Sequence, residues 1–155
     1  VMYIRSDYGD ESLYEACKAH NKTFDVIVSR FSIHHQPDER KYSLYKEIYD
    51  LLNENGAFIN IEHVAACGQW GPTVFEQYMI SYLYQYQIQK GKEPKREDIK
   101  KDLRERHRRD ANVITSVQKQ CRWLSEIGFR DVDCYFKLFQ LAIFGGRRIG
   151  ESKKK

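Results

Sequence analysis

The stretch that decides the fold is FDVIVSRFSIHHQPDERKYSLYKEIYDLLNENGAFINI, from Phe24 to Ile61. It opens with an apolar run at Phe24–Ser29, which is typical of a strand covered on both faces. Asp38 is expected to cap a helix that Asn55-Gly56 ends, and Ala57–Ile61 follows as a second strand. A strand, a helix of this length and another strand form a βαβ unit. The two strands should therefore be parallel neighbours in an α/β domain.

Further elements are expected on both sides of this unit. In chain order they are a strand at Val1–Arg5, a short helix at Asp10–His20, a loop at Gly68–Pro72, a tyrosine-rich helix that Gly91 ends, a charged surface helix within Lys92–Asp110 and an amphipathic helix at Ser116–Ile127. The last two strands, one after Gly128 and one at Phe139–Gly146, are too close in sequence for a crossover helix, so they should form an antiparallel hairpin. The predicted fold is a mostly parallel α/β sheet with a C-terminal antiparallel hairpin.

The composition fits one soluble domain. The chain has 155 residues, of which 41% are apolar and 31% charged, and this balance is typical of globular proteins. Apolar runs such as Leu141–Phe144 are far shorter than the roughly 20 residues that cross a bilayer, so no membrane is expected. Four widely spaced cysteines without a Cys-x-x-Cys pair indicate reduced thiols in a cytoplasmic protein. The net charge of +4 is modest, and three positives lie in the terminal lysines.

Polar residues follow three of the expected strands. They are Ser6-Asp7-Tyr8, Ser29-Arg30-Phe31 and Glu62-His63. Because parallel α/β sheets place their ligand sites at the carboxyl ends of the strands, these residues should surround a binding site.

The order of these motifs resembles the C-terminal part of the class I S-adenosylmethionine-dependent methyltransferases. Ser32-Ile33-His34-His35 looks like the family's apolar-His-His turn after the fourth strand. Asn53–His63 is similar to the stretch where a glycine precedes the fifth strand, although Ala57 stands where the family more often has a second glycine. None of the nine glycines forms the family's glycine-rich cofactor loop, and Val1 is not an initiator residue. The resemblance therefore implies a truncated Rossmann-like domain.

The resemblance also implies a division of the chain and an activity. Residues 1–150 would form the partial methyltransferase domain, with 68–115 as an inserted helical substrate cover, and 151–155 a basic tail. As part of a longer protein, the chain would take part in methyl transfer from S-adenosylmethionine to a small-molecule acceptor, and this enzyme fragment alone would be inactive. Its unpaired strand edge would favour self-association.

Roles for individual residues follow from the same resemblance. They are cofactor contacts at Asp7, Tyr8, Ser29, Arg30 and Phe31, general-base candidates at His34, His35 and His63, and acceptor contacts at Trp70, Tyr78 and Tyr82. A general base is needed only when the acceptor must lose a proton.

Plainer interpretations stay open for these residues. Asp7 could cap a turn, the histidine pair could satisfy loop backbone groups, and the tyrosines could serve packing. His34, His35, Glu62 and His63 have side chains that suit zinc or iron, but no metal is predicted. The charged helix has nine Lys/Arg against six Asp/Glu within residues 92–110 and can be a solvated face.

Two other classes of function also stay open. One is a nucleic-acid (tRNA) methyltransferase that uses the charged helix on phosphates, and the other is a non-catalytic interaction module. No Ser-His-Asp order, Cys-His pair or phosphate loop supports a hydrolase or kinase.

Overall fold

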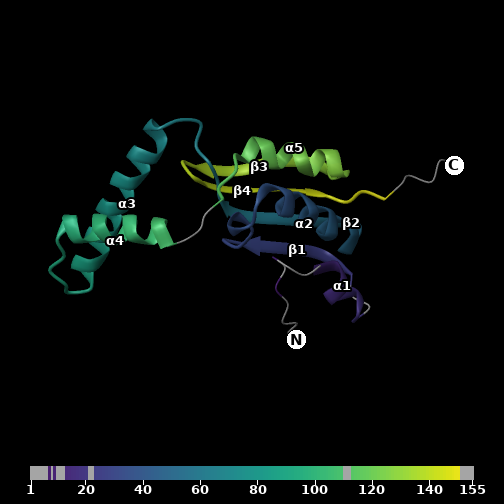
Figure 1. Cartoon of the computed structure of the whole chain (residues 1–155), viewed down its shortest axis with the longest axis horizontal. Helices are drawn as coiled ribbons and strands as arrows, with labels where there is room; N and C mark the ends of the chain where they lie inside the picture. The colour runs from purple at the N-terminus through teal and green to yellow at the C-terminus, as the bar shows by residue number, and fades with distance from the viewer. Residues whose placement is uncertain (1–6, 8, 10–12, 21–22, 110–112, 151–155) are drawn as a thin grey trace.

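The computed structural model describes residues 7, 9, 13–20, 23–109 and 113–150 (Figure 1). Its elements are α1 (Leu13–Lys18), β1 (Phe24–Arg30), the 3-10 helix η1 (Ile33–His35), α2 (Asp38–Leu51), β2 (Leu52–His63), α3 (Trp70–Gln89), α4 (Arg96–Arg109), α5 (Val117–Ile127), β3 (Arg130–Leu138) and β4 (Leu141–Arg147). The predicted strand at Val1–Arg5, Tyr8 and the basic tail lie outside the described residues.

The four strands form one sheet in the order β1-β2-β4-β3. β1 and β2 are parallel, with Val28 opposite Ile59, and this confirms the predicted βαβ unit. β4 is antiparallel to both β2 and β3, so the predicted C-terminal hairpin lies in the same sheet. The α/β class is confirmed. The described sheet is mixed rather than mostly parallel, because two of its three strand pairs are antiparallel.

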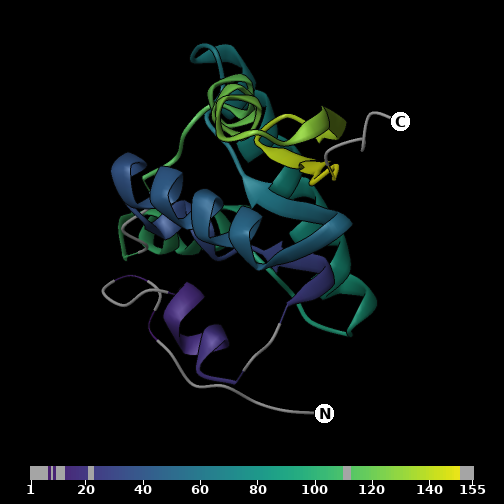
Figure 2. The same cartoon turned by 90° about the vertical axis from the view of Figure 1, so that its right-hand side faces the viewer.

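One face of this sheet carries the hydrophobic core. Figure 2 shows α2 and α5 side by side on that face. Alternate residues of β2 are buried, and Phe58 packs with Tyr45 of α2, Leu124 of α5 and Phe144 of β4 in one cluster. Period-2 burial is what a strand shows when helices cover one of its faces.

The other face of β1 is open to solvent within the described residues. Val26 and Val28 are 57% and 60% exposed, although both side chains are apolar. The expectation that this strand is covered on both faces is therefore wrong for the described part of the chain. The side chains of this apolar run lie on two faces of the strand. Ile27 packs against the core on one face, whereas Val26 and Val28 are exposed on the other.

Both predicted ends of α2 need correction. Pro37 is the N-cap, and Asp38 is the first helical residue, where its charge favours the helix dipole without a capping hydrogen bond. The helix runs directly into β2, so Asn55-Gly56 does not end it and lies inside the strand. The β1–β2 register shifts beside this point. A Cβ on Gly56 would lie 2.9 Å from the carbonyl oxygen of Asn53, so close backbone approach explains the glycine.

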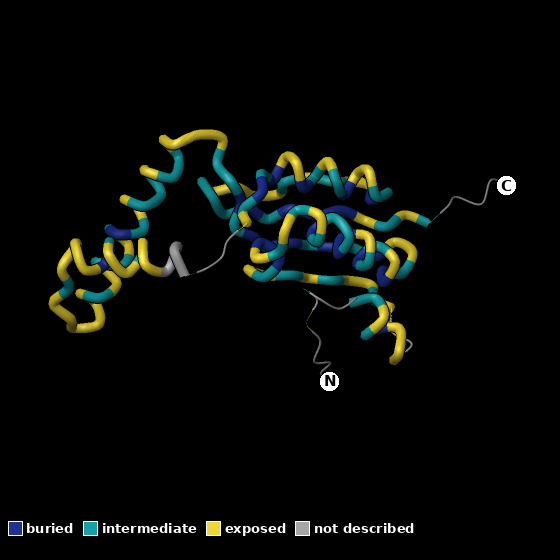
Figure 3. The backbone as a smooth tube through the Cα atoms, viewed as in Figure 1, coloured by how far each residue is buried: buried dark blue, intermediate teal, exposed yellow. Residues whose placement is uncertain are grey.

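The helices α3 and α4 form an arm that projects from the sheet, as Figures 1 and 3 show. α3 begins at Trp70, so the predicted loop is shorter than expected. Its side chains are mostly exposed or half-buried: Ile80 is its one buried residue, and Ile99 is buried in α4. The ring of Phe75 lies 5.7 Å from that of Phe139, which joins the base of the arm to the β3–β4 turn. As expected, Gly91 follows α3, with a positive φ of 72°.

Candidate functional site

The carboxyl ends of β1 and β2 lie together, as parallel pairing requires. After β1 the amide of Phe31 donates to the carbonyl oxygen of Ile61, at 2.8 Å. Phe31 has a φ of 47°, a left-handed conformation that non-glycine residues seldom adopt. This turn leaves the side chains of Arg30 and Phe31 exposed, with the guanidinium 5.6 Å from the ring centroid. Backbone strain of this kind is often found at functional sites.

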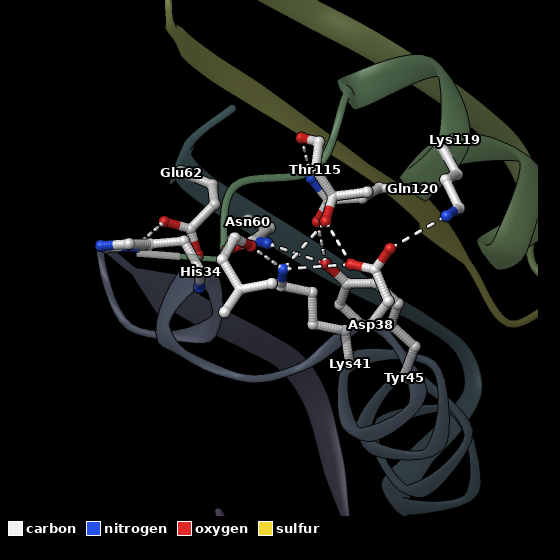
Figure 4. A network of polar contacts seen from close by, with 10 residues as sticks. His34, Asp38, Lys41, Tyr45, Asn60, Glu62, Thr115, Lys119 and Gln120 are labelled. Atoms are coloured by element: carbon white, nitrogen blue, oxygen red, sulfur yellow. Dashed lines mark hydrogen bonds and ion pairs between the residues drawn. The ribbon is translucent and has the colours of Figure 1, made fainter. Parts of the chain in front are cut away.

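A buried carboxylate fixes the orientation of His34. Glu62 is 0% exposed, and its Oε1 lies 2.5 Å from Nδ1 of His34. The same carboxylate accepts the backbone amides of His34 (3.0 Å) and His63 (2.9 Å). Because a carboxylate only accepts, Nδ1 of His34 carries a proton toward Glu62, and the ring nitrogen that faces away from Glu62 is Nε2. Figure 4 shows this second ring nitrogen pointing away from Glu62.

The two other predicted base candidates lie beside this pair. The ring centroid of His35 is 3.9 Å from that of His34, and the ring of His63 is 6.0 Å away at a steep angle. His35 is exposed and His63 half-buried, whereas His34 is only 7% exposed. The structure thus brings all three histidines together, and the carboxylate of Glu62 holds the ring of His34.

A second polar cluster adjoins this site, and the sequence analysis missed its centre. Lys41 is 1% exposed, although lysines are seldom fully buried. Its Nζ donates to the carbonyl oxygen of Val113 and to Oγ1 of Thr115, and it lies 3.4 Å from Oδ1 of Asp38. Burial lowers the pKa of Lys41, and the nearby carboxylates of Asp38 and Glu62 oppose this shift. Its position, four residues before Tyr45 on the apolar stripe of α2, was a usable signal.

A chain of buried hydrogen bonds joins this cluster to the sheet. The hydroxyl of Tyr45 donates to Oε1 of Gln120 at 2.5 Å and accepts from Nδ2 of Asn60 at 3.3 Å. Gln120 in turn donates to the carbonyl oxygen of Thr115 at 3.0 Å. Burial raises the pKa of Tyr45 far above its usual value, so the hydroxyl stays neutral. Figure 4 shows these side chains bridging α2, β2 and α5.

The predicted cofactor residues are described only in part. Asp7 is exposed, and its Oδ1 accepts a hydrogen bond from the amide of Gly9 at 2.9 Å. This contact is the turn-capping role that the sequence left open for Asp7. A Cβ on Gly9 would lie 3.2 Å from the side chain of Gln36, so this segment lies next to the end of η1. Ser29 is half-buried and faces Asn60 in the strand register. Their roles as cofactor contacts stay predictions.

The predicted acceptor contacts lie on the surface of α3. Trp70 is 77% exposed, and Tyr78 and Tyr82 are also exposed. Trp70 lines a cavity of about 550 Å³ that also contacts Lys137. Another cavity, of about 540 Å³, lies between α3, α4 and the β3–β4 turn, and Phe75, Met79 and Leu103 are among the residues lining it. The roles of the three predicted acceptor contacts also stay predictions.

Within the part of the chain that the structure describes, no group of three or more His, Cys, Asp or Glu side chains is arranged to hold a metal ion. None of the helices there is long and apolar enough to cross a membrane.

Comparisons with known proteins find the same fold in solved structures. No family model and no curated protein matches this chain. An O-methyltransferase family protein from Burkholderia thailandensis matches with a TM-score of 0.61 over 97% of this chain and 36% of its own, at 8% identity. The methyltransferase SibL, described as S-adenosylmethionine-dependent and solved in its apo form, gives 0.57 over 94% and 35%, at 14% identity. Human N-acetylserotonin methyltransferase in complex with SAM gives 0.55 over 94% and 33%, at 16% identity.

At identities of 8 to 16%, the likeness to these solved structures is one of fold. The chain spans about a third of the length of these solved structures.

Proposed function

From a fold shared with the class I S-adenosylmethionine-dependent methyltransferases, we propose that this chain carries the base side of a methyl-transfer site. The proposed reaction transfers the methyl group of S-adenosylmethionine to a hydroxyl of a small-molecule acceptor. It takes place in a longer protein that contains this chain. The observation that supports it most is the buried Glu62–His34 pair at the carboxyl ends of two parallel strands.

Bound S-adenosylmethionine supplies a methyl group already activated on a sulfonium. His34 then accepts the proton that the acceptor hydroxyl loses, through the lone pair of Nε2. Glu62 holds the ring in the required tautomer and stabilises the imidazolium that forms, because its carboxylate lies 2.5 Å from Nδ1. The exposed His35 offers a second proton acceptor next to it.

The exposed residues at the end of β1 fit one wall of a cofactor site. Val28 and Phe31 present apolar surface for the adenosyl part, and the exposed Arg30 can pair with the carboxylate of the methionine part. The carboxylate of Asp7 has one described bond, to Gly9, and keeps acceptor capacity for an adenine amino group. The predicted contacts Asp7, Tyr8, Ser29, Arg30 and Phe31 would hold the cofactor, with Val28 beside them.

The arm is the proposed acceptor cover. Trp70, Tyr78 and Tyr82 present aromatic surface, which suits an apolar or aromatic small molecule. The charged side chains of α4 do not favour a nucleic-acid acceptor over a small-molecule acceptor. Arg104 pairs with Glu76 at 3.0 Å, and Arg96 lies over the ring of Tyr84, so both cations are engaged within the arm.

The proposal extends to cellular setting and association. All four cysteines are free, which suits a cytoplasmic protein. β1 is an edge strand of the described sheet with exposed apolar side chains, so the isolated chain should self-associate through it. Sedimentation equilibrium of the isolated chain tests this point, and a concentration-independent monomer mass would contradict it.

The test of the proposed reaction uses the full-length protein. Tritiated S-adenosylmethionine and a panel of small phenols and alcohols report methyl transfer, and calorimetry reports cofactor affinity. His34→Gln should lower the rate by at least ~100-fold without changing cofactor affinity, because a general base contributes about 10²–10⁴-fold. His35→Gln is the matched neighbour and should cost far less. Absence of S-adenosylmethionine binding by the wild-type protein would exclude the methyltransferase class. Full activity of His34→Gln would exclude His34 as the base.

A further inference from the structure

Residues 113–116, called the strap here, return the chain from the arm to α5. The amide of Val113 donates to the carbonyl oxygen of His34 at 3.0 Å. The amide of Ala65 donates to the carbonyl oxygen of Thr115 at 3.1 Å. The strap therefore bonds the segment after β1 to the segment after β2, at the two strand ends that carry the candidate bases.

The side chain of Lys41 forms hydrogen bonds to two residues of this strap. Its ammonium donates to the carbonyl oxygen of Val113 and to Oγ1 of Thr115, and the hydroxyl of Thr115 donates to Asp38. Asp38 also binds Nζ of Lys119 at 2.9 Å. Figure 4 shows the ammonium at the centre of these contacts. Three acceptors around one buried cation offset much of its desolvation cost.

Stability alone does not require a charge at this position. Buried ion pairs can often be replaced by well-packed apolar side chains without loss of stability, because desolvation consumes most of the Coulomb gain. Moreover, both strap residues that Lys41 contacts also make main-chain bonds at the candidate site. The position of the Lys41 ammonium therefore indicates that it aligns the candidate site.

We propose that Lys41 is a positioning residue, which acts through the strap to fix the backbone of His34 and to tie the arm to the candidate base. The inference rests on the proposed function. Glu62 fixes the ring and the amide of His34, whereas the strap fixes its carbonyl oxygen. Loss of the strap contact frees one side of η1, so Nε2 no longer meets the acceptor at a single position. Misplacement of a reacting group costs rate rather than cofactor affinity.

The closing experiment uses the full-length protein and four variants. Thr115→Val removes the hydroxyl between Lys41 and Asp38 while keeping the shape, and Thr115→Ser restores it. Lys41→Met removes the ammonium, and Lys46→Met is the same change at an exposed position of the same helix. Turnover and the KM for S-adenosylmethionine are measured with the best acceptor from the panel above. Hydrogen exchange of the Val113 amide reports the strap without any need for activity.

Thr115→Val and Lys41→Met should lower kcat ~10-fold or more, which is about 1.4 kcal/mol in the barrier, with KM for S-adenosylmethionine unchanged. Exchange of the Val113 amide should accelerate by a similar factor. Thr115→Ser and Lys46→Met should behave like wild type. If Lys41→Met does not fold, the Thr115 pair alone decides the matter.

The inference and the proposed function can fail separately. If the hydrogen-exchange rate of the Val113 amide is unchanged in Thr115→Val, the Lys41 cluster does not hold the strap, whatever the activity. Accelerated exchange with unchanged kcat overturns the positioning role, since the cluster would then be a structural anchor. A wild-type protein that transfers no methyl group overturns the proposed function and with it the positioning role, while the exchange data still report whether Lys41 holds the strap.

Discussion

Replacing Glu62 by Gln tests the centre of the site with a change of one atom. The glutamine keeps the size of the side chain but only one acceptor oxygen. In the wild type, Oε1 accepts from Nδ1 of His34 and the amide of His63, and Oε2 accepts from the amide of His34. The amide group of the glutamine must replace one of these oxygens, so at least one buried N–H will face another donor. An unsatisfied buried donor costs about 1–3 kcal/mol.

The remaining bonds weaken as well, because they lose a charged acceptor. A hydrogen bond to a charged group contributes about 1.5–3 kcal/mol against about 0.5–1.5 kcal/mol for a neutral pair, so the total loss should be about 2–4 kcal/mol. That is a large share of the roughly 5–15 kcal/mol by which domains are stable.

Urea unfolding followed by tryptophan fluorescence measures this loss as a lower midpoint at an unchanged slope. Glu54→Gln, in an exposed position of the same strand, is the matched control and should change the free energy of unfolding by less than about 0.5 kcal/mol. A loss below about 1 kcal/mol for Glu62→Gln would show that the three contacts are not what holds His34 in place.

Three further predictions concern packing within the sheet, stability at acidic pH and the affinity for the cofactor. Gly145→Ala should unfold or severely destabilise the protein in thermal melts, since the new Cβ would lie 2.0 Å from the carbonyl oxygen of Phe58; Gly68→Ala, with nothing within 4 Å, should be silent. Burial raises the pKa of Asp38, but hydrogen bonds and nearby positive charges together outweigh it and hold the pKa below its ordinary value of 3.8. The stabilising contribution of this carboxylate is therefore present above that pH and is lost as the pH falls through the folded-state pKa. The stability gap between wild type and Asp38→Asn should therefore close on acidification, and a constant gap down to pH 2 would contradict this. Asp7→Ala should weaken S-adenosylmethionine binding by about 1–3 kcal/mol in calorimetry of the full-length protein, whereas unchanged affinity would leave Asp7 as a turn residue.

Local patterns were enough to predict most of the sheet and the last helix. Ser116 caps α5 by accepting the amide of Lys119, and Gly128 ends the helix with a φ of 123°. Such signals act within four residues, so they can be read from the sequence. The helix end at Leu51 could not be read in this way. The chain there enters β2 directly, and pairing with β1 outweighs the local turn preference of Asn55-Gly56.

The sequence predicted which strand ends form the candidate site, but not which side chains contact one another there. Parallel pairing placed the histidine turn next to Glu62 and His63, as expected. The bond between Glu62 and His34 joins residues 28 positions apart, and that between Lys41 and Thr115 joins residues 74 positions apart. Such contacts depend on how the arm returns to the sheet, and no local periodicity encodes that path. A lysine within an apolar stripe was the remaining clue to the second cluster.

The hydrogen bond between Ala65 and Thr115 also has an evolutionary consequence. It brings the two stems of the arm together, so the intervening residues form a nearly closed loop on the domain. Lengthening a closed loop adds little entropic cost, about 0.6 kcal/mol for each doubling. The arm can therefore diverge, grow or be exchanged between homologues while the sheet keeps its register. If the arm covers the acceptor as proposed, a change in this one segment would alter acceptor recognition without displacing His34 and Glu62.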